Sequence, residues 1–146
     1  MLKARVALLG EAFRNEQFEV VIDMMHPSAF ATGVTKEDFL AMTKKASVQM
    51  KEVNFAILNE QLGTPGEVNF AGDELVAFYP RTMVMQMGAK KYRHTGFVIC
   101  VKKRAGGEWL FIDGEAVSKD LSSLGRFLPD LPKDLKLPET KVEEIE

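Results

Sequence analysis

The hydrophobic pattern of this chain changes its period near residue 50, and that change constrains the fold more than any other feature. Before it, apolar residues recur every three or four positions, as they do along one face of an amphipathic helix. After it, apolar runs are separated by short glycine-containing segments, which is typical of strands joined by tight turns. Helices followed by consecutive strands predict an α+β domain whose sheet is antiparallel.

Three helices are predicted in the first third of the chain. The first covers residues 2–15, and the second covers residues 16–25 and ends because Pro27 disfavours helical backbone at the residue before it. The third begins at Thr35, which forms a capping box with Asp38 in the place of the usual glutamate. Its inner face is expected to carry Phe39, Met42, Ala46 and Met50.

The later part of the chain predicts a meander of strands. The expected strands are residues 53–61, 68–70, 75–87, 92–103 and 108–113. Pro80 lies in the middle of the expected strand 75–87 and has no backbone N–H to donate to a neighbouring strand. It therefore predicts either a bulge or a locally unpaired edge.

Alternation along residues 92–103 divides this strand into two faces. One face carries Tyr92, His94, Gly96, Val98 and Cys100, and the other carries Thr95, Phe97, Ile99 and Val101. The second set is the more uniformly apolar, so we expect it to meet the helices. His94 is then expected on the outer face of the sheet, in a subunit interface.

The composition changes again after residue 115, and this defines three parts. Residues 1–115 are expected to form a single α+β domain. Residues 116–140 contain three prolines among several leucines, which predicts an irregular strap that packs on the domain. Residues 141–146 are mostly charged and are predicted to be a disordered tail.

Bulk charge and composition exclude several classes of protein. The net charge is −2, from 19 basic and 21 acidic side chains, so the basic surplus of a nucleic-acid-binding protein is absent. No run approaches the roughly 18 apolar residues of a membrane span. The one cysteine, Cys100, lies in an apolar run, which predicts a buried and unreactive thiol. A single cysteine forms no internal disulfide and favours a cytoplasmic location.

Two segments carry a resemblance to a known superfamily. These are FEVVIDMMHP from Phe18 to Pro27, followed by a third helix, and the closing strand EWLFIDG from Glu108 to Gly114. In this order of elements the chain resembles nuclear transport factor 2-like proteins of the cystatin-like α+β type, particularly polyketide-cyclase-like and uncharacterised bacterial members. The resemblance covers residues 1–115.

This resemblance implies a cone, in which three helices pack on a strongly curved antiparallel sheet, and a homodimer formed through that sheet. The superfamily contains isomerases, dehydratases, cyclases and epoxide hydrolases that act on small, mostly apolar substrates. It also contains non-enzymatic binding and assembly modules. No catalytic residue can be transferred to this chain from the resemblance, because shared fold is not shared function.

Five side chains are candidates for lining such a cone. Asp23 and His26 are three positions apart, so the carboxylate could orient the imidazole as a general base. Alternatively, Asp23 faces solvent and His26 caps the last carbonyls of its helix. Tyr79 could donate its hydroxyl to an oxyanion, or place it at the edge of the core. The other two are Trp109, interpreted as a core or interface anchor, and His94.

Neither a metal nor a cofactor is predicted. The two histidines have no cysteine or carboxylate at ligand spacing, and the glycines form no phosphate-binding pattern. Two functions remain open. One is a dimeric domain that binds a small apolar molecule inside the cone, with an isomerase-, dehydratase- or cyclase-like activity. The other is a non-catalytic protein-interaction or dimerisation module.

Overall fold

The computed structural model describes residues 2–27, 35–113, 130–131, 138 and 140–145. These residues form three helices and six strands, and the expected α+β class is confirmed. The helices are α1 (Leu2–Arg14), α2 (Phe18–Asp23) and α3 (Lys36–Glu52). The strands are β1 (Phe55–Leu62), β2 (Asn69–Ala71), β3 (Glu74–Met87), β4 (Lys90–Lys103), β5 (Leu110–Asp113) and β6 (Lys141–Ile145).

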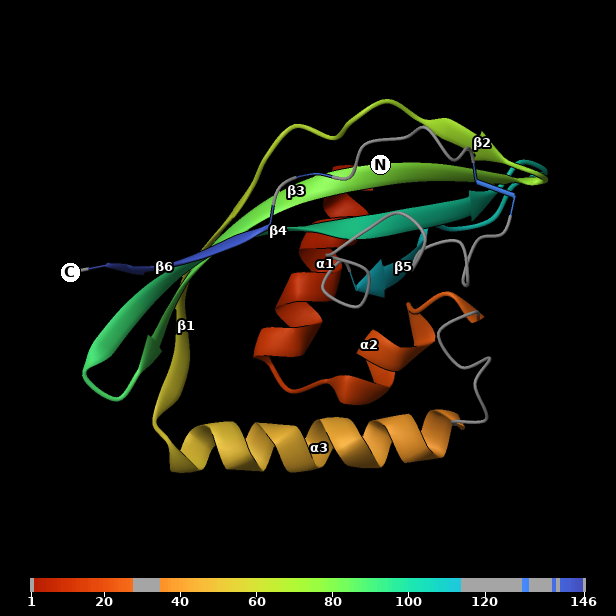
Figure 1. Ribbon diagram of the computed structural model, residues 1–146. Helices are drawn as coiled ribbons and strands as arrows, with labels where there is room; N and C mark the ends of the chain where they lie inside the picture. Colours follow the sequence, from red (N-terminus) through yellow and green to blue (C-terminus); the bar gives the residue numbers. More distant parts are fainter. Residues whose placement is uncertain (1, 28–34, 114–129, 132–137, 139, 146) are drawn as a thin grey trace.

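A long hairpin of β3 and β4 is the centre of the sheet. The two strands pair without a register shift from Glu74–Lys103 to Met87–Lys90. Their two-residue turn starts at Gly88, whose φ of 61° suits glycine. β1 and β2 pair with opposite ends of β3, and β5 and β6 pair with opposite ends of β4, all antiparallel. The sheet is curled but does not close (Figure 1).

Pro80 lies in the part of β3 that neither β1 nor β2 pairs with. Its carbonyl points to that edge, since it accepts a hydrogen bond from the Gly63 N–H at 2.9 Å. The nitrogen of a strand residue points to the same edge as its carbonyl, so the missing N–H costs no bond to β4. Of the two predictions for Pro80, the locally unpaired edge is therefore confirmed, and the pairing of β3 with β4 continues without a bulge.

Both faces of the sheet carry buried side chains. The helix-facing cluster consists of Val6, Met24, Ala77, Tyr79, Val98, Cys100 and Phe111. The outer-face cluster consists of Ala71, Val76, Phe78, Phe97, Ile99, Val101, Ile112 and Leu131. The face of β4 predicted to meet the helices is thus the outer one, and that prediction was wrong. Because both faces are covered, the more apolar face is not diagnostic of contact with helices.

The third helix packs less deeply than expected. Its capping box is confirmed, because the Thr35 hydroxyl accepts from the Asp38 N–H and the Asp38 carboxylate accepts from the Thr35 N–H. However, α3 buries none of its described side chains fully, and Met42 is 62% exposed and Met50 39% exposed. α1 and α2 cover the concave face of the sheet, and α3 lies beyond them (Figure 1). Met42 and Met50 therefore do not face the core, contrary to the prediction.

The end of the chain is ordered into a strand, contrary to the predicted tail. Lys141–Ile145 pairs with Lys91–Thr95 of β4 as β6. A charged composition did not prevent strand formation, because β4 offers an open edge at that point and alternate β6 side chains face solvent. Most of the predicted strap (residues 116–140) lies outside the described residues. Leu131, one of the strap residues described, is buried in the outer-face cluster.

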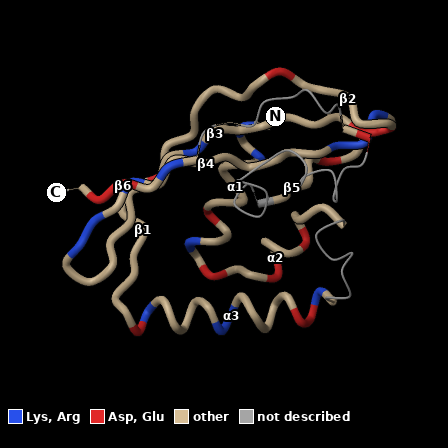
Figure 2. Tube along the Cα trace, in the orientation of Figure 1, with Lys and Arg blue, Asp and Glu red and all other residues tan. Residues whose placement is uncertain are grey.

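Acidic and basic residues are interspersed along the helices and strand ends (Figure 2). This distribution fits the small net charge of the chain. Within the part of the chain that the structure describes, none of the helices is long and apolar enough for a transmembrane segment.

Candidate functional site

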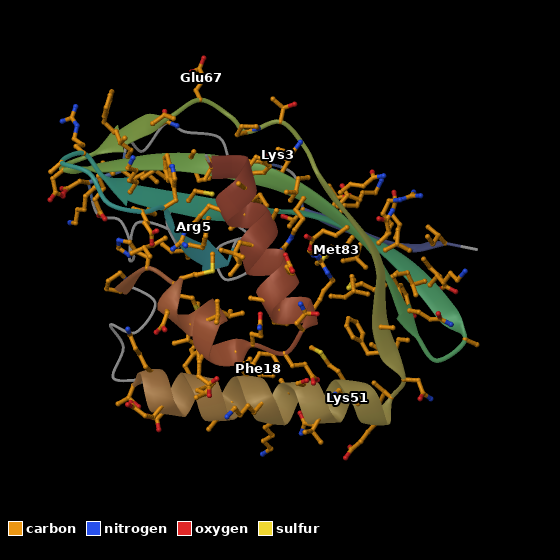
Figure 3. The ribbon with its side chains drawn as sticks, turned by 180° about the vertical axis from the view of Figure 1, so that it is seen from behind. Lys3, Arg5, Phe18, Lys51, Glu67 and Met83 are labelled. Atoms are coloured by element: carbon orange, nitrogen blue, oxygen red, sulfur yellow. The ribbon has the colours of Figure 1, made fainter. Side chains whose placement is uncertain are left out.

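A cleft of about 410 Å³ lies between α1 and β1. Its lining combines apolar and polar side chains: Ala7, Arg14, Ile57, Leu58, Asn59, Glu60 and Leu62. In Figure 3, α1 and β1 both stand in front of the long hairpin, and Met83, the cross-strand partner of Glu60, lies between them. The cleft is therefore placed where the first helix meets the curled edge of the sheet.

A β-bulge at Leu58 turns Glu60 toward the helices. β1 pairs as Ile57–Met85 before the bulge and as Glu60–Met83 after it, and the register shifts between Ile57 and Asn59. Met83 and Met85 are two residues apart and share a face, so Ile57 and Glu60 share that face too. Unbroken alternation would have put Glu60 on the opposite face. The extra residue thus brings a charged side chain to the helix side of the sheet.

Gly10 of α1 leaves the space that this carboxylate occupies. A Cβ at Gly10 would lie 2.5 Å from Glu60 Oε1, which is closer than a non-bonded contact allows. The Glu60 side chain is only 11% exposed, and Arg14 Nη1 donates to Oε1 at 3.2 Å. A glycine inside a helix costs about 1 kcal/mol relative to alanine. Its position here is explained by the close approach of Glu60 to the helix.

The cleft is suited to an amphipathic molecule. Ala7, Ile57 and Leu62 provide apolar wall, while the Arg14–Glu60 pair provides donors and acceptors at one place. Arg14 is 41% exposed, so the guanidinium lies on the solvent side of the carboxylate. The lining is therefore mixed, and converging polar groups beside apolar wall are a feature of small-molecule sites.

The five candidates from the sequence lie elsewhere, and none of them lines this cleft. Tyr79 is buried in the helix-facing cluster. Burial raises the pKa of its phenol, and the neighbouring Cys100 adds to that increase. Trp109 packs at the margin of the same cluster, and its carbonyl accepts from Arg5 Nε at 3.1 Å. Trp109 is thus a core anchor that also holds α1, which is one of the two roles predicted for it.

His94 is buried within its own chain rather than at an outer interface. It shares the helix-facing side of β4 with Val98, because β4 pairs with β3 without a shift. Met83 on β3 and Val142 on β6 are its cross-strand partners. Gly96 accommodates the imidazole, since a Cβ there would lie 2.9 Å from His94 Cε1. The predicted outer position for His94 was wrong for the same reason as the face assignment of β4.

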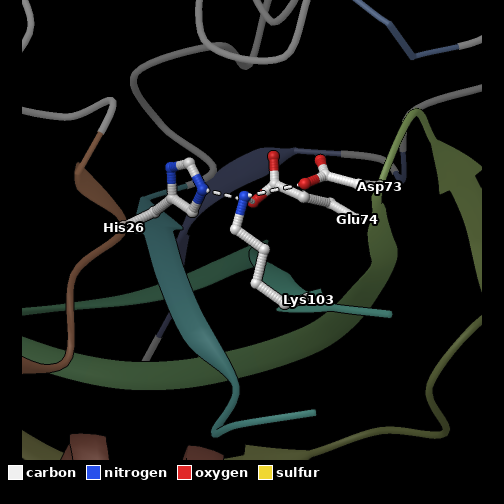
Figure 4. A network of polar contacts seen from close by, with 4 residues as sticks. All are labelled: His26, Asp73, Glu74 and Lys103. Carbon is white, nitrogen blue, oxygen red and sulfur yellow. Dashed lines mark hydrogen bonds and ion pairs between the residues drawn. The ribbon is translucent and has the colours of Figure 1, made fainter. Parts of the chain in front are cut away.

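His26 belongs to a polar network at the other end of the sheet. Its Nε2 lies 2.8 Å from Glu74 Oε2, and both side chains are largely buried, at 12% and 15% exposed. Lys103 Nζ lies 3.9 Å from the same oxygen and 3.3 Å from Asp73 Oδ2 (Figure 4). Asp23, the predicted partner, has an exposed side chain. The carboxylate that the structure brings to His26 is therefore that of Glu74, 48 residues away.

This network joins three segments of the chain. The His26 N–H donates to the Phe111 carbonyl at 2.8 Å, and the Phe111 N–H donates to the Met24 carbonyl at 2.9 Å. The residues after α2 thus extend the sheet beyond β5 by a parallel bridge. The imidazole then reaches the start of β3. Because these polar side chains contact one another, we interpret the network as a structural clamp.

Among the described residues, the cysteine and the possible metal ligands give no further site. The predicted burial of Cys100 is confirmed, and this burial raises the pKa of its thiol to about 12. Among the residues that the structure describes, no three histidine, cysteine, aspartate or glutamate side chains gather as they would around a metal ion.

Sequence reasoning missed Arg14, Glu60 and the cleft itself. A glycine in the middle of a strongly periodic helix was the available signal, because it marks a close approach of another group. Comparison of the chain with protein-family models, curated proteins and solved structures found no match. The resemblance to nuclear transport factor 2-like proteins therefore stays a prediction.

Proposed function

We propose that this chain is a small-molecule-binding domain and that its ligand occupies the α1–β1 cleft. The observation that carries the proposal is the cleft itself, which joins apolar wall to the Arg14–Glu60 pair. Its volume of about 410 Å³ falls within the roughly 300–1,000 Å³ of small-molecule sites. The suggested superfamily supports this reading, since its enzymes act on small apolar substrates.

Two local features support a functional role for the α1–β1 cleft rather than imperfect packing between the helix and the strand. The bulge at Leu58 directs Glu60 to the helix side, and Gly10 leaves room for it there. Each feature is unfavourable on its own, because a bulge interrupts the ladder and a helical glycine costs stability. Both are explained together if Glu60 must stand in the cleft. Local departures from ideal structure of this kind are expected at functional sites.

The two exposed alanines of α1 allow a matched test. Ala7 lines the cleft and Ala4 does not, and both side chains are exposed to solvent. Ala7→Trp would fill the cleft, whereas Ala4→Trp adds the same indole elsewhere on the helix. A library of small apolar fragments should shift the amide signals of β1 in the wild-type chain and in Ala4→Trp, but not in Ala7→Trp. Equal shifts in both variants would place the ligand elsewhere and reject the proposal.

The alternative, an interaction or dimerisation module, is favoured by a different observation. α3 exposes apolar side chains at Met42 (62%) and Val48 (58%), and Val53 just after its end is 50% exposed. Exposed apolar side chains on one element can contribute to a contact surface. Sedimentation velocity tests this alternative: a dimer that Met42→Glu dissociates would support it, and a monomer at high concentration would remove its support.

A further inference from the structure

We propose that the ligand of the α1–β1 cleft is uncharged and ends in a group that both donates and accepts hydrogen bonds, such as a primary carboxamide. The Arg14–Glu60 pair would recognise that group. This inference rests on the proposed function, because it names the class of ligand that the same cleft takes.

The Arg14–Glu60 contact uses only part of the hydrogen-bonding capacity of the two side chains. One contact joins it, from Arg14 Nη1 to Glu60 Oε1 at 3.2 Å. Among the residues that the structure describes, no other side chain bonds to Glu60 Oε2 or to the remaining guanidinium nitrogens of Arg14. A carboxylate has two acceptor oxygens and a guanidinium has five N–H donors. The pair therefore offers a ligand an acceptor and donors side by side.

The charge of the cleft selects against ions. Arg14 and Glu60 are the charged residues of its lining, and their charges cancel. A charged ligand would lose hydration on entering and would gain no net opposite charge in return. A carboxamide loses less hydration, and its N–H can reach Glu60 while its oxygen accepts from Arg14. Its apolar part would lie against Ile57 and Leu62.

Removing either charge should change the preference in a defined direction. Glu60→Gln leaves Arg14 as the charged lining residue, so the cleft becomes cationic and should prefer an anion. Arg14→Gln leaves Glu60, so the cleft should prefer a cation. Glu60→Gln keeps the size and shape of the side chain, and Arg14→Gln keeps a polar but shorter one. Arg14 is 41% exposed, so Arg14→Gln tests the inference even if Glu60→Gln perturbs the fold.

Four probes that share one ring separate these cases: benzamide, benzoate, benzylammonium and toluene. Their dissociation constants are measured by titration, from the chemical shifts of the Ile57 and Leu62 methyl groups. The wild-type chain should bind benzamide about tenfold more tightly than either ion, a difference that corresponds to about one additional charge-assisted hydrogen bond. Benzoate should become the preferred ion for Glu60→Gln, and benzylammonium for Arg14→Gln.

The outcomes distinguish this inference from the proposed function. If toluene shifts the cleft methyl groups but benzamide binds no better than the ions, the inference is overturned and the proposed function stands. Preferences that do not change in the two variants also overturn it. If none of the four probes shifts these methyl groups, both the inference and the proposed function are rejected.

Discussion

Replacement of Gly10 by alanine tests whether this glycine is present for Glu60. In an ordinary helix interior the change should stabilise the chain by about 1 kcal/mol. Here the new Cβ would lie 2.5 Å from Glu60 Oε1, so the carboxylate must move. Movement breaks the contact with Arg14, which is worth about 0.2–1 kcal/mol for a pair with a solvent-exposed partner. We therefore expect little or no gain from Gly10→Ala in the wild-type chain.

The obstacle disappears when Glu60 is first shortened to alanine. In the Glu60→Ala background, Gly10→Ala should raise the unfolding free energy by about 1 kcal/mol, the full helix-propensity term. The two substitutions should thus be coupled by about 0.2–1 kcal/mol, the free energy of the Arg14–Glu60 contact that is lost in the wild-type background only. The four free energies of unfolding are measured by urea denaturation followed by circular dichroism.

A control in the same helix separates this coupling from a general effect on α1. Ala4→Gly should lower the unfolding free energy by about 1 kcal/mol in both backgrounds, because Ala4 is exposed and does not line the cleft. If Gly10→Ala stabilised the chain equally in both backgrounds, Glu60 would not be the reason for the glycine. The local account of the cleft would then be wrong.

Four further predictions concern the rest of the fold. His26→Ala should lower the unfolding free energy by about 1–3 kcal/mol, because it leaves the largely buried Glu74 without its imidazole partner. Asp23→Ala, at an exposed position, should change the unfolding free energy by less than about 0.5 kcal/mol. Urea denaturation of both variants measures the difference. Cys100 should not react with Ellman's reagent in the native chain at pH 8, and it should react fully in denaturant. The pKa of the Cys100 thiol is about 12 in the folded chain and near 8.5 in an unfolded one. The contribution of Cys100 to the unfolding free energy should therefore fall as pH rises from about 8.5 to about 12. Denaturation at several pH values measures this decrease. A chain ending at Thr140 should show faster amide exchange at residues 91–95, which β6 covers, and unchanged exchange at residues 98–101, which β5 covers.

Local patterns predicted most of the individual elements. The Thr35–Asp38 capping box could be predicted from the sequence, because its two hydrogen bonds join residues three positions apart. Pro80 could be predicted in part, because its missing N–H restricts it to a bulge or an unpaired edge, and the structure has the second. The buried state of Cys100 followed from its apolar neighbours along the strand. In each case the sequence around the residue contains the physical cause.

The features that sequence missed depend on contacts between distant segments. The outer face of β4 is as apolar as a helix-facing one because its side chains are buried too, in a cluster that includes Leu131. His26 lies opposite Glu74 only after the chain folds, so the nearer Asp23 was a misleading partner. Glu60 could not be assigned to the cleft by alternation, because the bulge at Leu58 inverts the alternation between Ile57 and Glu60.

The most direct test of the central claim is a map of contacts between bound benzamide and the protein. Intermolecular nuclear Overhauser effects can be measured on a sample with labelled methyl groups. Contacts from the benzamide ring to the methyl groups of Ala7, Ile57 and Leu62 are the result that we predict. Contacts to Met42 and Val48 on α3 instead, with none to the three cleft residues, would contradict a ligand site between α1 and β1.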